Sequence, residues 1–167
     1  MHRSMPDINY FIAIGIGLLV LFGIMFAAQI CLAEQIDMNV IAQIESSNNP
    51  LAYNERTQAT GLYQITLPAL TDYNNYHKKK HALSEMFEPK KCYSVANWYM
   101  NFMLPKYFKY YKIEDTVENR LIAWHDGIGN LIKFLNNKRT LGKEMRGFMG
   151  KYNEMSYYIR KYNEINE

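Results

Sequence analysis

One carboxylate, Glu45, stands at the margin of an expected apolar helix face. It follows Ile44 directly and Ile41 by four positions, and residues four apart share one side of a helix. Apolar neighbours remove water from a carboxyl group, which raises its pKa above the unperturbed value of about 4.3. Such a group can donate a proton near neutral pH, as a general acid does. The alternative is a solvated glutamate at an exposed helix end, and Glu45 alone does not decide between the two.

Four further stretches follow the Glu45-Ser46 pair. They are "GLYQI" (61–65), "FEPKKCYSVANWYM" (87–100), "AWHDGIGN" (123–130) and "EMSYYIRK" (154–161). In this order and spacing they resemble the catalytic domain of the lytic transglycosylases, which share a fold with goose-type lysozyme and cut peptidoglycan. The family pattern is Glu-Ser, Gly-Leu-Met-Gln, Asp-Pro-x-x-Asn-Ile, Ala-Tyr-Asn-Ala-Gly-x-Gly and Glu-Thr-x-x-Tyr-Val. The resemblance covers roughly residues 38 to 162, and several short motifs in order are far more specific than one.

The resemblance implies an all-α, lysozyme-like helical domain with a catalytic cleft in which Glu45 is the only acid. Glu45 would protonate the leaving oxygen of the β-1,4 bond between N-acetylmuramic acid and N-acetylglucosamine. It would then take the proton of the 6-hydroxyl, which closes a 1,6-anhydro ring. Because that hydroxyl is tethered to the reacting sugar, no second carboxylate is needed. Neither a metal nor another cofactor is implied.

A second carboxylate of the kind that hydrolysing glycosidases use is not evident in the sequence. Glu55, Asp72 and Asp126 are the candidates, and each fits a surface, cap or turn position better. Three functions therefore stay open. They are a transglycosylase, a true muramidase that uses water, and an inactive peptidoglycan-binding component of a secretion, conjugation or phage entry machine.

Substrate contacts also follow from the resemblance. Ser46 would orient Glu45 or the acetamido group of the sugar, or else be a polar residue at a helix end. Gln64 would reach into the cleft, Gly61 would let the backbone approach the glycan, and the hydroxyl of Tyr158 would face Glu45. The whole predicted set of substrate-binding residues is Ser46, Gly61, Tyr63, Gln64, Trp124, His125 and Tyr158.

Three of these positions depart from the family pattern. Tyr63 replaces a methionine, while Trp124 and His125 replace the usual Tyr-Asn pair. Trp124 keeps an aromatic group, as a stacking wall or as a core residue. His125 exchanges an amide for an imidazole, and we expect either a groove contact or a half-exposed ring at a helix end.

A membrane-directed segment precedes the catalytic motifs. Residues 11–28, "FIAIGIGLLVLFGIMFAA", carry no charge over about the length that crosses a bilayer. Arg3 lies before the segment and acidic residues follow it, so the positive-inside rule predicts export of the remainder. The sequence divides into residues 1–33, an N-terminal transmembrane anchor or signal peptide cut after Ala33, and residues 34–167, the catalytic domain. Retention predicts inner-membrane anchoring with the domain in the periplasm, whereas cleavage or phage origin predicts a secreted or virion-associated protein.

Charge and cysteine content exclude other classes. The chain has a net charge of +3, which is too small to indicate nucleic-acid binding. The basic stretch "HKKKH" (77–81) is either a solvated loop or a contact for an anionic envelope surface. Cys92 is the only cysteine after residue 33, so the exported domain has neither an internal disulfide nor a cysteine metal cluster.

The exported part is predicted to be helical, with no run of strand type long enough for a sheet. Asp37 and Thr116 are expected helix caps, Pro68 and Pro89 expected first-turn residues, and Gly127 an expected helix end. Pro105 should end or bend the helix that starts at Pro89. Two final helices are expected at 129–137 and 152–165.

Overall fold

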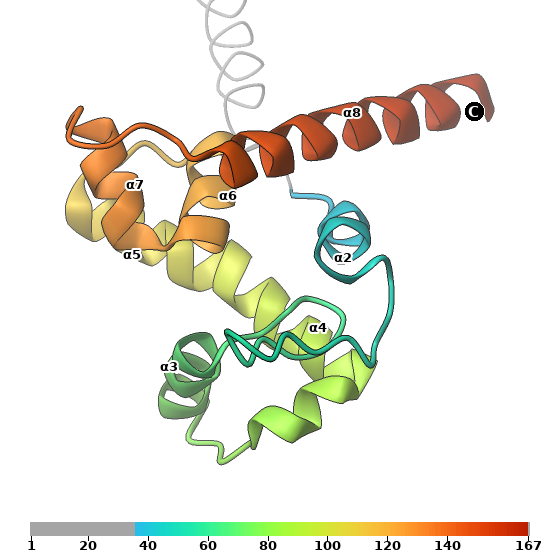
Figure 1. Ribbon diagram of the computed structural model, residues 1–167, viewed down its shortest axis with the longest axis vertical. Helices are drawn as coiled ribbons and strands as arrows, with labels where there is room; N and C mark the ends of the chain where they lie inside the picture. The colour runs from blue at the N-terminus through green and yellow to red at the C-terminus, as the bar shows by residue number, and fades with distance from the viewer. Residues whose placement is uncertain (1–35, 167) are drawn as a thin grey trace, which may run out of the picture. The chain divides into compact units, whose positions relative to one another are not determined.

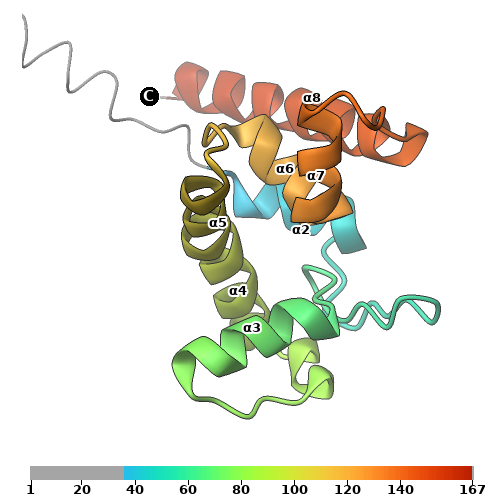
Figure 2. The same cartoon turned by 90° about the vertical axis from the view of Figure 1, so that its left-hand side faces the viewer.

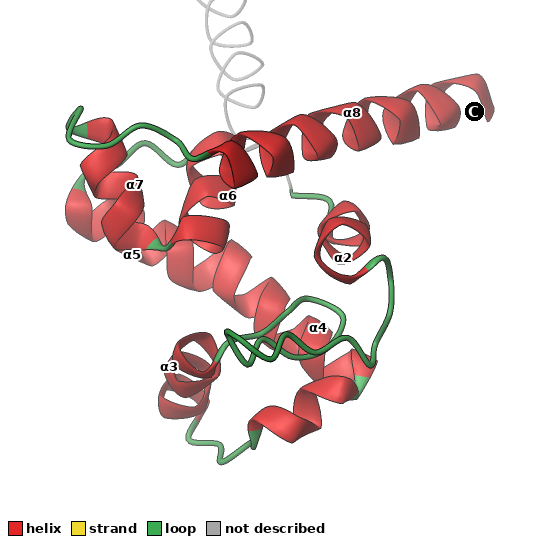
Figure 3. Cartoon of the chain, viewed as in Figure 1, coloured by secondary structure: helices red, strands yellow, loops and turns green. Residues whose placement is uncertain are grey.

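Helices dominate residues 36–166, the part of the chain that the computed structural model describes. In chain order they are α2 (Met38–Ser46), α3 (Leu67–His77), the 3-10 helix η1 (Leu83–Phe87), α4 (Pro89–Trp98), the π-helix η2 (Tyr99–Met103), α5 (Leu104–Tyr111), α6 (Val117–Asp126), α7 (Ile128–Leu135) and α8 (Lys143–Asn166). Figure 3 shows only helices and loops in this part. Outside the helices, the strand-type pairing there consists of isolated bridges, Tyr53 to Thr60 and Thr60 to Ile65. The predicted mainly helical class is confirmed.

The predicted anchor, residues 11–28, and the predicted boundary after Ala33 lie outside the described residues. Both therefore stay predictions. Between residues 36 and 166, no helix is both long and apolar enough to span a bilayer.

Several helix boundaries follow the predicted local chemistry. The carboxylate of Asp37 accepts hydrogen bonds from the N–H groups of Asn39 at 2.9 Å and Val40 at 3.4 Å, and so caps α2. Thr116 caps α6 by accepting from the N–H of Asn119 at 3.1 Å. Gly127, with φ +86°, ends α6 in a backbone region where glycine is favoured.

The sequence predicts that Pro105 ends or bends the helix that starts at Pro89, and an end is excluded. Helical structure continues through it, because Pro105 is the second residue of α5 (Leu104–Tyr111), directly after the π-helix η2. Proline has no backbone N–H, and in the first turn of an α-helix that group has no intrahelical partner to lose. The change from π-helix to α-helix before Pro105 therefore lets the helix continue. The last helix starts at Lys143 rather than at residue 152. Two glycines at 147 and 150 lower the helix propensity of its first half, which packing of that half compensates.

A continuous helical column, α4–η2–α5, connects the two regions of this part of the chain. Figures 1 and 2 show α3, η1 and the start of α4 at one end, and α6, α7 and α8 at the other. Arg120 joins α6 to this column, because its guanidinium donates to Asn101 in η2 at 3.1 Å. The same guanidinium pairs with Asp115 at 2.6 Å. The contact with Asn101 fixes η2 against α6, so their side chains meet in defined positions.

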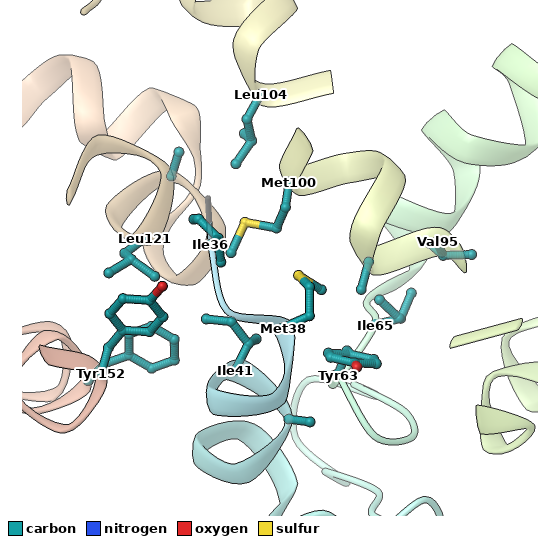
Figure 4. Close-up of a cluster of buried hydrophobic side chains, with 14 of the residues drawn as sticks. Ile36, Met38, Ile41, Tyr63, Ile65, Val95, Met100, Leu104, Leu121 and Tyr152 are labelled. Atoms are coloured by element: carbon teal, nitrogen blue, oxygen red, sulfur yellow. The ribbon is translucent and has the colours of Figure 1, made fainter. Parts of the chain in front are cut away.

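The core gathers buried side chains from every region of this part. Figure 4 shows Ile41 of α2 beside Met100, Leu121 and Tyr152. The hydroxyl of Tyr152 also accepts the N–H of Asp37 at 2.9 Å, which ties α8 to the start of α2. The packing of α2 on both sides therefore sets where its last turn, with Glu45, can lie.

Candidate active site

Glu45 lies in the last turn of α2, half-buried. The apolar periodicity that buries Val40, Ile41 and Ala42 turns the next position on that side, Glu45, toward the packed interior. Ser47 then adopts a left-handed conformation, φ 54°, and ends the helix. The carboxyl group is thereby fixed at the inner edge of a cavity instead of extending into solvent.

Trp124 of α6 provides the direct partner of this carboxyl group. Its indole Nε1–H donates to Oε1 of Glu45 at 2.8 Å. Tyr99 of η2 packs against the indole, with ring centroids 6.1 Å apart and an interplanar angle of 66°. Trp124 thus acts as a hydrogen-bond donor to Glu45, in addition to the predicted aromatic wall.

The environment raises the pKa of Glu45 above its ordinary value. Burial is the largest cause, because the carboxylate loses hydration. The Trp124 hydrogen bond and the charge of His125 act in the opposite direction and lower the pKa. The environment of this carboxyl group therefore favours its protonated form. When the proton is lost, Trp124 and His125 stabilise the carboxylate.

A cavity of about 680 Å³ opens beside Glu45. Two others in the described part are smaller, at about 250 and 300 Å³. Five parts of the chain contribute to the wall: the end of α2, the 54–66 loop with the start of α3, the start of η2, the end of α6 with Gly127, and the first turn of α8. The lining residues are Glu45, Asn54, Arg56, Thr57, Ala59, Gln64, Ile65, Thr66, Pro68, Ala69, Tyr99, Ala123, Trp124, His125, Asp126, Gly127 and Glu144. Its mixture of apolar and hydrogen-bonding groups is typical of a binding cleft.

His125 and Asp126 line the same cavity. The Nδ1 atom of His125 lies 2.8 Å from Oδ1 of Asp126, and Arg139 donates to Oδ2 of Asp126 at 3.1 Å. Phe148 packs on the imidazole at a centroid distance of 5.1 Å. These contacts hold the ring at the cleft wall, in the last turn of α6, where His125 is exposed. This position agrees with both options for His125, a groove contact and an exposed ring at a helix end.

Gln64 also lines the cleft. Its amide nitrogen donates to the carbonyl oxygens of Gly61 at 3.0 Å and Ala52 at 3.3 Å. With φ 49°, its backbone is left-handed, which the turn around it requires. The amide nitrogen is occupied by the loop, which leaves the amide oxygen as the acceptor that a substrate can meet.

Three predicted contacts support the loop beneath the cleft and do not line it. The hydroxyl of Ser46 donates to the carbonyl oxygens of Leu62 at 2.8 Å and Ala42 at 3.1 Å, so it joins the helix end to the loop. Gly61 has φ +79°, and a Cβ there would lie 2.0 Å from the carbonyl oxygen of Met86. Tyr63 is 3% exposed and belongs to the core (Figure 4). These residues shape the cleft indirectly, by packing.

Tyr158 lies away from Glu45. Its side chain is 63% exposed on the second half of α8, and only the first half supplies buried residues, Met145, Phe148 and Tyr152. The hydroxyl predicted to face the catalytic glutamate is therefore not placed there. The side chain that donates a hydrogen bond to Glu45 is instead Trp124.

Sequence reasoning missed several cleft residues. Tyr99 is the most notable, because burial raises the pKa of its hydroxyl to about 12 and keeps it protonated as a donor. Asn54, Arg56 and Thr57 come from a stretch that the sequence identifies only as a loop, and Glu144 from a region with no predicted helix. A tyrosine in an amphipathic helix gives no signal of this role, whereas the polar loop between two motifs of one site gives a weak one.

No group of three or more His, Cys, Asp or Glu side chains within residues 36–166 is placed to hold a metal ion. What the arrangement can do chemically is proton transfer. It combines one desolvated acid, an N–H group that donates to that acid and a cavity of about 680 Å³ beside both.

Comparison with known families identifies one match. The model of the family described as Transglycosylase SLT domain matches residues 32–146. This range is well over half of the 167 residues and contains Glu45, Gln64 and Trp124, while the "EMSYYIRK" stretch lies beyond it. Neither the curated proteins nor the solved structures give a match.

The Trp124 contact gives a prediction for catalysis. Trp124→Phe keeps an aromatic ring against Tyr99 and removes the N–H donor. The variant should lose about 1.5–3 kcal/mol of transition-state stabilisation, the range for a hydrogen bond to a charged group, and its turnover should fall accordingly. Because this donor lowers the pKa of Glu45, the alkaline limb of the pH–rate profile should also move to higher pH. If the alkaline limb does not move, Trp124 only forms part of the cleft wall and does not affect the pKa of Glu45. Tyr158→Phe, which changes an aromatic residue outside the cleft, is the matched control.

Proposed function

Since the chain belongs to the transglycosylase SLT domain family, which acts on peptidoglycan, we propose that it is a lytic transglycosylase that uses Glu45 as its only acid and base. The observation that supports this most is the position of Glu45. It is desolvated at the edge of a large cleft, and its carboxyl group accepts a hydrogen bond from Trp124. A desolvated acid with a stabilised conjugate base suits a group that must give up a proton and then regain one.

In the first step, the protonated carboxyl group of Glu45 donates its proton to the bridging oxygen of the β-1,4 bond. The bond between that oxygen and the anomeric carbon of N-acetylmuramic acid breaks, and N-acetylglucosamine leaves with a free 4-hydroxyl. The acetamido oxygen of the muramic sugar stabilises the positive charge at the anomeric carbon. Glu45 is now a carboxylate, which the Trp124 N–H and the charge of His125 stabilise.

In the second step, the Glu45 carboxylate takes the proton of the 6-hydroxyl group. The 6-oxygen bonds to the anomeric carbon of the same sugar and closes the 1,6-anhydro ring. Glu45 returns to its protonated state, so no water is consumed. Closure within one sugar benefits from effective molarity, which replaces the second carboxylate of a hydrolase.

Contacts along the glycan follow from the cleft lining. We assign Gln64, Trp124, His125 and Tyr99 to the sugars nearest Glu45, and the polar loop residues Asn54 and Arg56 to sugars or peptides farther along. The substrate lies outside the cytoplasmic membrane, and the charge-free segment 11–28 supports export with membrane anchoring. Membership of an envelope-spanning or phage machine remains a part of this proposal that only partner identification tests.

Product analysis tests the proposed reaction. Purified sacculi digested with the full-length protein should release muropeptides that end in 1,6-anhydro-N-acetylmuramic acid, each lighter by one water than the hydrolysed product, and no new reducing ends. Glu45→Gln is the blank.

Two outcomes would replace the proposal. New reducing ends would indicate a muramidase, for which Asp126 and Glu144 are the cleft carboxylates to test as activators of water. Binding to sacculi without any released product would indicate a glycan-binding protein.

A further inference from the structure

A second cavity, of about 250 Å³, lies between the loop after α3 and the first two turns of α4. Its lining is mostly basic, and the residues are Tyr73, Lys79, His81, Lys90, Lys91, Ser94 and Val95. Figures 1 and 2 show this loop at the end of the described part that is away from α6, α7 and α8. None of these residues lines the cleft beside Glu45, so the cavity is separate from the catalytic one.

The segment around this cavity is basic. Residues 77–91 contain five lysines and two glutamates, a net of +3. A local excess of positive charge attracts anions to the surface that carries it.

Not all of this charge is neutralised within the segment. Lys91 pairs with Glu88 at 2.8 Å and with Glu85 at 3.0 Å. For Lys79 and Lys90, residues 36–166 offer no ion-pair partner within 4.0 Å, although both line the cavity. Two ammonium groups from different elements therefore face one space with their charge unused.

The loop that carries Lys79 is tied down by several hydrogen bonds. Asn74 of α3 accepts the N–H of His81 at 3.1 Å through its side chain and donates to the carbonyl of His81 at 2.9 Å, while its own carbonyl accepts the N–H of Lys79 at 2.9 Å. Glu85 accepts from the N–H of Ala82 at 2.8 Å and lies 3.0 Å from Nδ1 of His81. A loop that only displayed lysines to solvent would not need these ties, whereas a binding site gains affinity from being preorganised.

The start of α4 adds donors to the same wall. Pro89 occupies its first position, and the N-cap residue Glu88 makes no side-chain hydrogen bond to the first-turn N–H groups. Such groups carry partial positive charge. Lys90 and Lys91 follow Pro89 in this first turn and both line the cavity, so the start of the helix lies beside it.

We propose that this cavity binds a phosphate group of the cell envelope, with Lys79 and Lys90 as its charge partners. A phosphate has more acceptor oxygens than a carboxylate and carries up to two charges, which suits two unpaired ammonium groups and nearby N–H donors. Tyr73 and Val95 form the apolar part of the wall, and the volume of about 250 Å³ has room for a phosphate group. The site would hold the enzyme close to an anionic polymer or lipid while the cleft acts on the glycan. The binding itself does not depend on the proposed reaction.

The test measures affinity in the full-length protein in an uncharged detergent, from the rise of Tm with ligand concentration. The ligands are inorganic phosphate, monomeric dihexanoyl phosphatidylglycerol and acetate, at equal ionic strength. Lys79→Gln and Lys90→Gln should each weaken phosphate binding by about five- to tenfold, the range for one partly solvated charged hydrogen bond. Lys80→Gln and Lys109→Gln remove the same charge outside the cavity and should leave the affinity within about twofold of wild type.

Equal losses in all four variants would overturn the proposal, because they would indicate diffuse attraction instead of a site. Equal affinity for acetate and phosphate would overturn it as well. Tighter binding of the lipid than of inorganic phosphate would identify the membrane headgroup as the source, and similar binding of the two would identify a soluble or polymer phosphate. Release of anhydro-muropeptides by the same variants reports on the catalytic proposal separately, since none of the four lysines lines the cleft.

Discussion

Glu45→Gln should abolish most peptidoglycan cleavage while the protein remains folded. Glutamine has nearly the shape of glutamate but can neither donate the proton in the first step nor accept one in the second. Turnover should therefore fall by at least roughly 10²–10⁴, the range attributed to general acid–base catalysis. The measurement is the release of anhydro-muropeptides from sacculi. Near-normal release by this variant would contradict the single-acid mechanism.

The same substitution has a defined effect on stability. Burial raises the pKa of Glu45 in the folded protein, so folding favours the protonated form. The stability that this group contributes is present below its unfolded pKa and is lost as pH rises through its folded pKa. Glutamine has no proton to lose, so the variant should equal or exceed the wild-type Tm at pH 7 and lose the advantage at pH 4.

Asp126→Asn is the matched control for the loss of a cleft carboxylate. Asp126 lines the same cavity, but its oxygens are engaged by His125 and Arg139. A modest decrease in turnover, far smaller than that of Glu45→Gln, is expected. If Asp126→Asn abolishes cleavage while Glu45→Gln does not, the acid is Asp126.

The place of Glu45 at the edge of an apolar helix face could be predicted, because it depends on local periodicity and on a short motif. Two residues of the same helix face, Ile41 and Ile44, place Glu45 at the margin of an apolar face, and the cap at Asp37 sets the helix start. The hydrogen bond from Trp124 could not be predicted in the same way. It joins residues 79 positions apart, and only the packing of α2, η2 and α6 decides which polar atom meets the carboxyl group.

The differences between prediction and structure have physical causes of the same kind. A short motif predicts a substrate contact for Tyr158, yet α8 starts earlier than expected and carries this residue on its exposed half. Tyr99 was missed because it lies in a π-turn, which shifts the side of the helix that a residue faces without changing the hydrophobic pattern. Ser46 agrees with the second of its two predicted roles, a polar residue at a helix end, because its hydroxyl donates to a loop carbonyl. The ring of Tyr63 packs in the core and not in the cleft.

Gly61→Ala should destabilise the fold more than any surface change, and the cause lies beneath the cleft. The added Cβ would lie 2.0 Å from the carbonyl oxygen of Met86, a backbone atom that cannot rotate away, and the φ of +79° is strained for alanine. Left-handed strain of about 1–2 kcal/mol and overpacking of about 1–3 kcal/mol together predict a loss of roughly 2–5 kcal/mol in the free energy of unfolding.

Denaturant unfolding measures this loss, and Gly127→Ala is the control that separates backbone strain from overpacking. Gly127 also has a positive φ, +86°, with ψ 151° in a region that only glycine adopts readily, and its Cβ would meet nothing within 4 Å. Gly127→Ala should therefore lose about 1–3 kcal/mol through backbone strain alone, without overpacking. Equal losses in the two variants would show that the contact with Met86 relaxes and that Gly61 is needed for its backbone conformation alone.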